Sequence, residues 1–317
     1  MQLDKRTLGA LAKDLGFVRD TLEKVCRLAE ILKFMQEDEL LSRSLALKGG
    51  TAINLTIFDL PRLSVDIDLD YCKGLQRDEM LSDRQIITSM ISKYMLANGY
   101  TLSSRSKSYH ALDSFVYEYK NAGGVKDNIK IEINYMLRCH LLPVNRREVK
   151  LPWSQDELKV LTVDPIEIFA SKTVALLTRT APRDLYDIHN MIKHGLFDKA
   201  EEEMLRKCAV FYSAIGTEHP PENFSFGNID KVSKMQIKRD LYPVLRKGET
   251  FDLEAVQAEA KEYMSAVLIP TEEEIDFWRE FSAGNYRPEL IFGERQETEN
   301  VRSHPMAIWK CEKNKLK

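Results

Sequence analysis

The sequence predicts a mixed α/β fold whose second half is helical, with the boundary near residue 160. Residues 64–71 (SVDIDLDY) and 128–135 (NIKIEINY) alternate polar and apolar side chains, a pattern typical of half-buried strands. From about residue 164 onward the apolar residues instead recur at helical spacing. We therefore expect an α/β domain with N-terminal helices over residues 1–160 and a helical domain over residues 161–317.

Local signals place the other elements. Residues 1–40 have helical periodicity, residues 45–48 form a short apolar strand that ends at a glycine pair, and a brief helix follows over residues 51–58. A helix over residues 78–97 ends at an Asn-Gly pair, which favours a helix C-cap. Further strands are predicted over 101–108 and 114–119, and further helices open at Pro165 and extend over 182–192, 199–213, 252–266 and 271–283.

The composition limits the class of protein. Hydrophobic residues make up 44% and charged residues 30% of the chain, which indicates an ordinary globular protein rather than a disordered one. The net charge of −3 excludes a strongly basic nucleic-acid binder, so a polyanionic partner would need a local basic patch. Five scattered cysteines without a CxxC pair favour reduced thiols and no zinc site. Because the chain has no apolar run of about 18 residues and no apolar signal segment, we expect a cytoplasmic protein that does not enter the membrane.

Three carboxylates lie on one face of the SVDIDLDY segment. Side chains alternate along a strand, so Asp66, Asp68 and Asp70 project together. Like charges this close destabilise one another unless a cation lies among them, and Mg²⁺ is the usual cation where phosphates are bound. An EF-hand calcium loop is disfavoured because Tyr71 replaces its glycine and Arg77 replaces its last glutamate. A solvated strand face is the simpler alternative, and Asp70 is either an outer ligand or an exposed acid.

A glycine turn precedes this strand. Residues 48–51 (KGGT) follow one predicted strand and open a helix, where glycine lets backbone N–H groups approach a phosphate closely. Such a sequence alone is more often only a turn, but its order relative to Asp66, Asp68 and Glu132 is typical of a nucleotidyltransferase active site. The turn would hold a triphosphate and the two aspartates would bind two Mg²⁺ ions. Glu132 would complete the metal site or accept the proton of the attacking hydroxyl, unless it is a solvated strand residue.

Five short motifs follow one another along the chain: KGGT at 48–51, RLSVDID at 62–68, KIEI at 130–133, Ser171-Lys172, and RDLYD at 183–187. Together they resemble the successive motifs of the AbiEii/AbiGii-type toxins. These are nucleotidyltransferase-like toxins of type IV toxin–antitoxin and phage-defence systems, and they are similar to the mycobacterial MenT proteins.

The resemblance implies a polymerase-β-like nucleotidyltransferase fold in which a helical second domain completes the active site. It implies transfer of a nucleotide from an NTP substrate to an acceptor hydroxyl, which for the MenT members is the 3′ end of a tRNA. It also implies a cognate antitoxin as protein partner. By motif position, Asp66 and Asp68 would bind the two Mg²⁺ ions and Lys172 the triphosphate. Asp184, or less favourably Asp187, would be the later aspartate of the family.

Local chemistry supports Lys172 as well, because its neighbours three and four positions away on the predicted helix are apolar and an ammonium there needs an anion or a route to water. The candidate catalytic residues are therefore Asp66, Asp68, Glu132, Lys172 and Asp184, and the candidate metal ligands are Asp66, Asp68 and Glu132. The candidate nucleotide-binding residues are Gly49, Gly50, Thr51, Arg62, Ser64, Lys172 and Asp187.

Simpler structural alternatives stay open for several of these residues. Arg62 and Ser64 either position the aspartate strand or contact the phosphates or the base. Lys172 could extend to solvent, and Arg183 and Asp187 could form an exposed helical ion pair. Two other functions also stay open: nucleotidylation of a protein or small-molecule hydroxyl, and a non-catalytic nucleotide-binding interaction protein.

Overall fold

The computed structural model describes residues 4–315, so the first three and last two residues of the two predicted domains lie outside it. The chain divides into two units. The first, here the sheet unit, contains the chain up to Arg138 together with Val144–Val163 and Pro243–Glu249. The second, here the helical unit, contains Cys139–Pro143, Asp164–Tyr242 and the chain from Thr250 onward. The sequence predicts a single boundary near residue 160. It does not predict that residues 139–143 belong to the helical unit or that residues 243–249 belong to the sheet unit.

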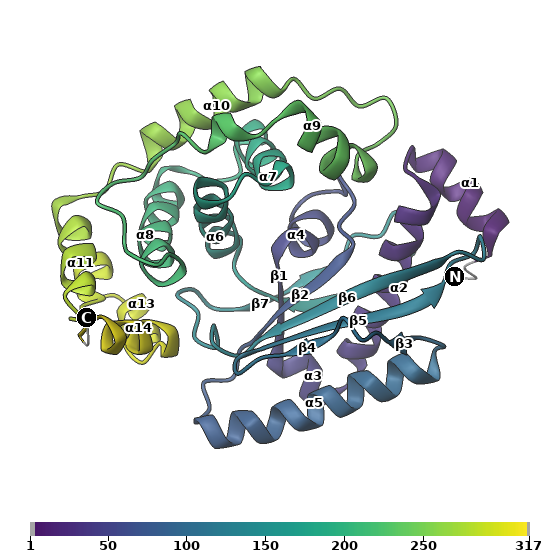
Figure 1. Cartoon of the computed structure of the whole chain (residues 1–317), viewed down its shortest axis with the longest axis horizontal. Coiled ribbons are helices and arrows are strands. Elements are labelled where there is room, and N and C mark those ends of the chain that lie inside the picture. Colours follow the sequence, from purple (N-terminus) through teal and green to yellow (C-terminus); the bar gives the residue numbers. More distant parts are fainter. Residues whose placement is uncertain (1–3, 316–317) are drawn as a thin grey trace. The chain divides into compact units, whose positions relative to one another are not determined.

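The sheet unit is built on a mixed sheet with the strand order β3-β5-β6-β2-β1-β8-β7, in which β4 pairs with β5 (Figure 1). The pairs β2–β6 and β1–β8 are parallel, and the other pairs are antiparallel. The strands are β1 Leu45–Lys48, β2 Asp66–Tyr71, β3 Thr101–Leu102, β4 Lys107–Ser108, β5 Leu112–Lys120, β6 Lys126–Asn134, β7 Asn145–Glu148 and β8 Lys159–Thr162.

One face of this sheet forms the core of the unit. The inward residues of β2 and β6, among them Ile67, Leu69, Ile131 and Ile133, are buried because their side chains alternate with the polar ones. Helices cover this face, and two of them stack Phe34 on Tyr94 with ring centroids 3.9 Å apart. The helices of the unit that precede β6 are α1 Lys5–Leu15, α2 Arg19–Glu37, α3 Glu39–Ser44, α4 Gly49–Ala52 and α5 Arg77–Ala97.

α4 lies on the opposite face of the sheet and follows β1 directly in the chain (Figure 1). The π-helical segment Ile53–Ile57 continues α4, and Figure 1 shows α4 and α5 on opposite sides of the sheet. α5 carries a capping box between Gln76 and Glu79 and ends at Asn98 before Gly99, whose φ is +79°. The sheet therefore has a helix-covered apolar face and a polar face next to α4.

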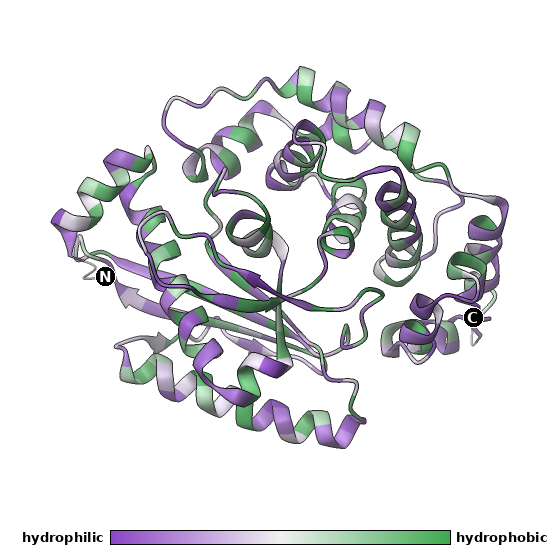
Figure 2. Cartoon of the chain, turned by 180° about the vertical axis from the view of Figure 1, so that it is seen from behind, coloured by the Kyte–Doolittle hydropathy of each residue, from purple (hydrophilic) through white to green (hydrophobic). Residues whose placement is uncertain are grey.

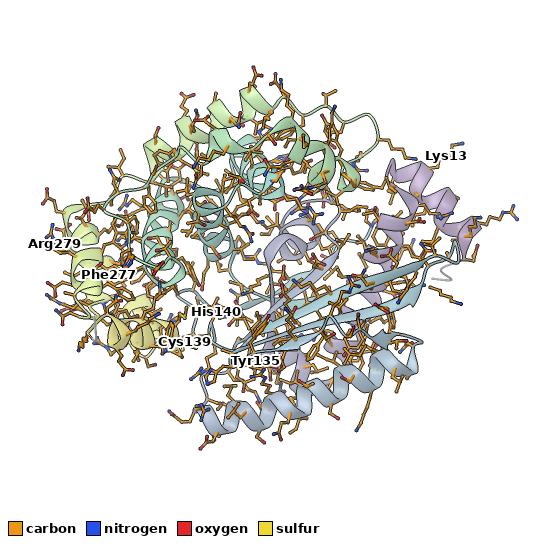
Figure 3. All side chains as sticks on the ribbon, in the orientation of Figure 1. Lys13, Tyr135, Cys139, His140, Phe277 and Arg279 are labelled. Carbon is orange, nitrogen blue, oxygen red and sulfur yellow. The ribbon has the colours of Figure 1, made fainter. Side chains whose placement is uncertain are left out.

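The helical unit consists of amphipathic helices that enclose an aromatic core. Phe211, Phe277, Phe281 and Phe292 are buried at its centre. Figure 2 shows apolar and polar residues on different sides of these helices, and Figure 3 shows Phe277 and Arg279 on different sides of one of them. The helices are α6 Pro165–Thr178, α7 Pro182–Lys193, α8 Lys199–Gly216, α9 Lys234–Gln236, α10 Leu253–Val267, α11 Glu272–Ser282, α12 Glu289–Phe292, α13 Gln296–Val301 and α14 Pro305–Lys315. Shorter turns of 3-10 or π type occupy Ile229–Lys231, Ile237–Leu241 and Tyr242–Val244.

The predicted mixed α/β fold is confirmed, but one predicted strand is wrong. The segment 101–108 forms two short strands, β3 and β4, because residues 103–106 make a turn in which the N–H of Ser106 donates to the carbonyl of Ser103. The hydroxyl of Ser103 is engaged with Glu118 and that of Ser106 with the backbone of Val116. These serine side chains compete with regular strand pairing. Across residues 4–315 we find no helix with the length and apolar character needed to cross a membrane.

Candidate active site

The central strand β2 presents its aspartates on the polar face of the sheet. Asp66 and Asp68 are half-buried there, whereas Asp70 is buried. The ammonium of Lys48 lies 2.5 Å from a carboxylate oxygen of Asp70. The exposed-acid alternative for Asp70 is therefore wrong, because this carboxylate is buried and is paired with the ammonium of Lys48 on the neighbouring strand β1.

The strand β6 brings two further charged residues to the same face. In the parallel pairing of β2 and β6, Asp66 lies beside Lys130 and Asp68 lies beside Glu132. The ammonium of Lys130 is 2.7 Å from Oε2 of Glu132. Burial acts to lower the pKa of Lys130, but the hydrogen bond and charge of Glu132, together with the charges of Asp66 and Asp68, raise it overall. We call the patch formed by Asp66, Asp68, Lys130 and Glu132 the acid face.

The glycine turn is in contact with this acid face. Gly49 has φ of +66°, and a Cβ atom at this position would lie 2.5 Å from Oδ2 of Asp68. A Cβ atom on Gly50 would lie 2.7 Å from Nη2 of Arg62 and 3.0 Å from Oγ of Ser64. Neither position has room for a side chain, so the turn needs both glycines. Arg62 and Ser64 thus lie against the turn that we predicted to hold a phosphate.

Buried side chains fasten the turn to the beginning of β2. The hydroxyl of Thr51 donates to the carbonyl of Asp66 at 2.5 Å. The amide of Asn54 donates to the carbonyl of Gly50 at 2.7 Å, and its oxygen accepts from the backbone N–H of Arg62 at 3.3 Å. Thr51, Asn54 and Arg62 are all buried. These side chains therefore hold the glycine turn in a fixed position relative to Asp66 at the start of β2.

The donor chemistry of the acid face suits a hard divalent cation, although its third carboxylate is engaged elsewhere. Asp66 and Asp68 offer oxygen atoms on one half-buried face, which are the ligands that Mg²⁺ prefers. Among residues 4–315, however, no three side chains of histidine, cysteine, aspartate or glutamate are gathered as a metal-binding group. Glu132 instead contacts Lys130. Asp66 and Asp68 thus fit the metal, and Glu132 would have to join them.

The helical unit contains a second charged cluster. The ammonium of Lys172 on α6 lies 2.8 Å from Asp184 and 2.9 Å from Asp187, both in α7. Arg179 lies 3.0 Å from the other oxygen of Asp184. We call Lys172, Asp184 and Asp187 the lysine–aspartate cluster. Two buried carboxylates thus flank the ammonium that we expected to need an anion.

The exposed alternatives for this cluster are wrong. The side chain of Lys172 is only 9% exposed, so it does not extend to solvent. Asp187 is buried against Lys172, and Arg183 donates from Nε to the carbonyl of Asp240 at 2.9 Å. Burial acts to raise the pKa of Asp184, but the charges and hydrogen bonds of Lys172 and Arg179 outweigh it and lower this pKa.

The structure therefore places the candidate residues in two groups. The sheet unit holds Gly49, Gly50, Thr51, Arg62, Ser64, Asp66, Asp68 and Glu132, and the helical unit holds Lys172, Asp184 and Asp187. Sequence reasoning missed Lys48, Asn54, Lys130 and Arg179. Lys48 and Lys130 lie inside motifs that we singled out, but only strand register shows that they face the aspartates.

Comparisons with known proteins identify the family of the chain. A family model described as "Nucleotidyl transferase AbiEii toxin, Type IV TA system" matches residues 33–266. Among solved structures, the nucleotidyltransferase toxin MenT4 from Mycobacterium tuberculosis H37Rv is similar in fold, with a TM-score of 0.63 at 14% sequence identity over 95% of this chain and 98% of that chain. No curated protein matches the sequence. Because the family model covers most of its length, the chain is a nucleotidyltransferase that belongs to the AbiEii family of type IV toxin–antitoxin toxins.

Proposed function

We propose that this nucleotidyltransferase toxin transfers a nucleotide from an NTP to the 3′ end of a tRNA in a reaction that depends on Mg²⁺. The observation that carries the proposal is the position of Asp68, which lies beside Glu132 in the sheet and against the Gly49 turn. An acid pair, a third carboxylate and a glycine turn beside them are the parts that such a transfer needs.

Each part has a proposed role. Asp66 and Asp68 would hold the metal, with Glu132 as a further ligand or as the acceptor of a proton. The bound Mg²⁺ would supply positive charge to the phosphates and to the attacking hydroxyl. Gly49 and Gly50 would hold the triphosphate through their backbone N–H groups, because glycine has no side chain of its own to cover them.

Three further residues would support these groups. Thr51 would act as a positioning residue, because its hydroxyl is already donated to the carbonyl of Asp66. Arg62 would supply positive charge next to the turn, since its guanidinium is buried beside Gly50. Ser64 lies beside it and is the more accessible of the two for a phosphate oxygen.

The lysine–aspartate cluster has its own proposed role. Lys172, oriented by Asp184 and Asp187, would interact with the triphosphate. The acceptor hydroxyl would attack the α-phosphorus, forming the new P–O bond while the bond to the β-phosphate breaks. Pyrophosphate would leave and the hydroxyl proton would pass to a carboxylate or to water.

The choice of tRNA as acceptor and of an antitoxin as partner has different support. The type IV toxin–antitoxin family implies an antitoxin partner. The tRNA acceptor follows from the resemblance of the five motifs to the MenT toxins, in which a blocked acceptor end would stop aminoacylation.

One experiment separates the candidate acceptors. The purified full chain is incubated with a cell lysate, Mg²⁺ and each α-labelled NTP, and the products are then treated with ribonuclease or protease. Label that ribonuclease removes supports an RNA acceptor, and label that protease removes supports protein nucleotidylation. Asp59→Asn, which changes an exposed carboxylate of the same unit, is the control for Asp66→Asn. If no NTP yields labelled product while NTP still binds, the non-catalytic alternative holds.

A further inference from the structure

The acid face contains its own cation. Lys130 is directly beside Asp66 in the parallel pairing of β2 and β6, and it is two residues from Glu132 on the same side of β6. Its ammonium is 2.7 Å from Glu132, and the two side chains are 37% and 27% exposed. This lysine therefore lies in the row of carboxylates and is open to solvent on one side.

A second lysine of the sheet borders the acid face, because Lys48 lies beside Asp68 in the antiparallel pairing of β1 and β2. Lys48, on the other side of β2, is directed to Asp70, which is buried. Three carboxylates, Asp66, Asp68 and Glu132, thus remain on the acid face with Lys130 beside them. Like charges at this spacing repel one another, and one ammonium offsets part of that repulsion.

Glu132, the proposed third ligand, is the residue that makes this contact with Lys130. Asp66 and Asp68 fit a divalent cation, yet no group of three potential ligands is assembled among residues 4–315. Glu132, the nearest candidate for the third ligand in strand register, has one oxygen on Lys130 instead. A metal ion and the lysine ammonium would compete for the same carboxylate.

We infer that the ammonium of Lys130 binds the carboxylate of Glu132 in the metal-free protein. This ion pair must break before Glu132 can join Asp66 and Asp68 around a divalent cation. This inference rests on the proposed metal-dependent function and deepens it. Lys130 is then a positioning residue whose charge stabilises the metal-free acid face and weakens the binding of the metal.

The removal of the competing charge should have opposite effects on the two states. Lys130→Gln removes the ammonium that contacts Glu132, so the metal-free protein should unfold about 2 °C lower in the presence of EDTA. The same variant should bind Mn²⁺ about fivefold more tightly than the wild type, since the contact and the charge of Lys130 no longer oppose the metal.

A matched control is available on the same strand. Lys126 lies on the same side of β6, with its ammonium 2.6 Å from Glu118 of the neighbouring strand. Lys126→Gln therefore also removes a lysine from a lysine–glutamate pair, but away from Asp66 and Asp68, and should leave the Kd for Mn²⁺ unchanged. Lys130→Arg keeps the charge and should bind Mn²⁺ within about twofold of the wild type.

A double-mutant cycle tests whether Lys130 acts through Glu132. The Kd for Mn²⁺ alone, without nucleotide, is measured by calorimetry for the full chain, for Lys130→Gln, for Glu132→Gln and for the double variant. We expect Glu132→Gln to weaken binding and to abolish the gain from Lys130→Gln. A gain that persists in the Glu132→Gln background would show simple repulsion and overturn the inference, as would an unchanged Kd for folded Lys130→Gln.

The same measurements separate this inference from the proposed function. If wild type binds Mn²⁺ and Asp68→Asn does not, the metal site stands whatever Lys130→Gln does. If wild type binds no Mn²⁺, with or without an NTP, the metal-dependent function and the inference both fail.

Discussion

Gly49 and Asp68 are so close that a Cβ atom on Gly49 would lie 2.5 Å from Oδ2 of Asp68. This contact joins the turn after β1 to the acid strand β2. The carboxylate that we propose to bind the metal therefore lies next to the backbone that we propose to bind the triphosphate.

Gly49→Ala should abolish nucleotidyl transfer and destabilise the sheet unit. Alanine at φ of +66° costs about 1–3 kcal/mol, and its Cβ would displace the carboxylate of Asp68. Urea unfolding and the labelling assay measure the two effects. Gly74→Ala is the control, because a Cβ at that position meets no heavy atom within 4 Å. Equal activity of the Gly49→Ala and Gly74→Ala variants would refute the role of the turn.

Thr51→Val should lower both stability and activity, whereas Thr51→Ser should retain most of each. Valine removes the hydroxyl that donates to the carbonyl of Asp66, and the loss of such a hydrogen bond costs about 0.5–1.5 kcal/mol. Serine keeps that donor. We expect kcat to fall more than the apparent affinity for NTP, because the hydroxyl would position β2 without touching the nucleotide. A pure loss of NTP affinity would instead indicate that Thr51 binds the nucleotide.

Lys172→Met should destabilise the helical unit by about 3–5 kcal/mol, because it leaves two buried carboxylates without their shared ammonium. Chemical denaturation monitored by circular dichroism measures this change. Lys199→Met is the control, since Lys199 is an exposed lysine of the same unit whose side chain is 94% exposed. A Lys172→Met variant as stable as Lys199→Met would contradict the observed pairing.

The lowered pKa of Asp184 predicts an acid-labile contribution to stability. A carboxylate whose pKa is lower in the folded than in the unfolded protein stabilises the fold above the unfolded pKa of about 3.9. That stabilisation is lost as the pH falls through the folded pKa. The difference in unfolding free energy between wild type and Asp184→Asn should thus be largest near neutral pH and shrink below pH of about 4. A difference that is constant from pH 7 to pH 3 would show that Asp184 is not held as a carboxylate by Lys172 and Arg179.

Within each strand, the residues that contribute to the acid face could be predicted from the sequence. The alternation in residues 64–71 and 128–135 shows which side chains share a face, because the period of a strand is fixed at two residues. It does not show which strand lies next to which. The pairing of Asp66 with Lys130 joins residues that are far apart in the sequence, and so it depends on tertiary packing rather than on any local pattern.

Short elements and contacts between helices were harder to predict for related reasons. Residues 145–148 (NRRE) contain no apolar alternation, and β7 exists because it pairs with β8 at the edge of the sheet. Lys172 could be recognised as a lysine among apolar neighbours, but its partners Asp184 and Asp187 lie on a different helix. Asn54 carries no sequence signal of its own, because its role comes from the positions of Gly50 and Arg62 around it.

The most direct test of the central claim is mass spectrometry of tRNA 3′ ends after incubation with the purified chain, Mg²⁺ and each NTP in turn. We predict that wild type adds a nucleotide from at least one NTP, and that Asp68→Asn, still folded, adds none. A folded wild-type protein that extends no tRNA with any NTP, or an Asp68→Asn variant that extends tRNA as well as the wild type, would contradict this prediction.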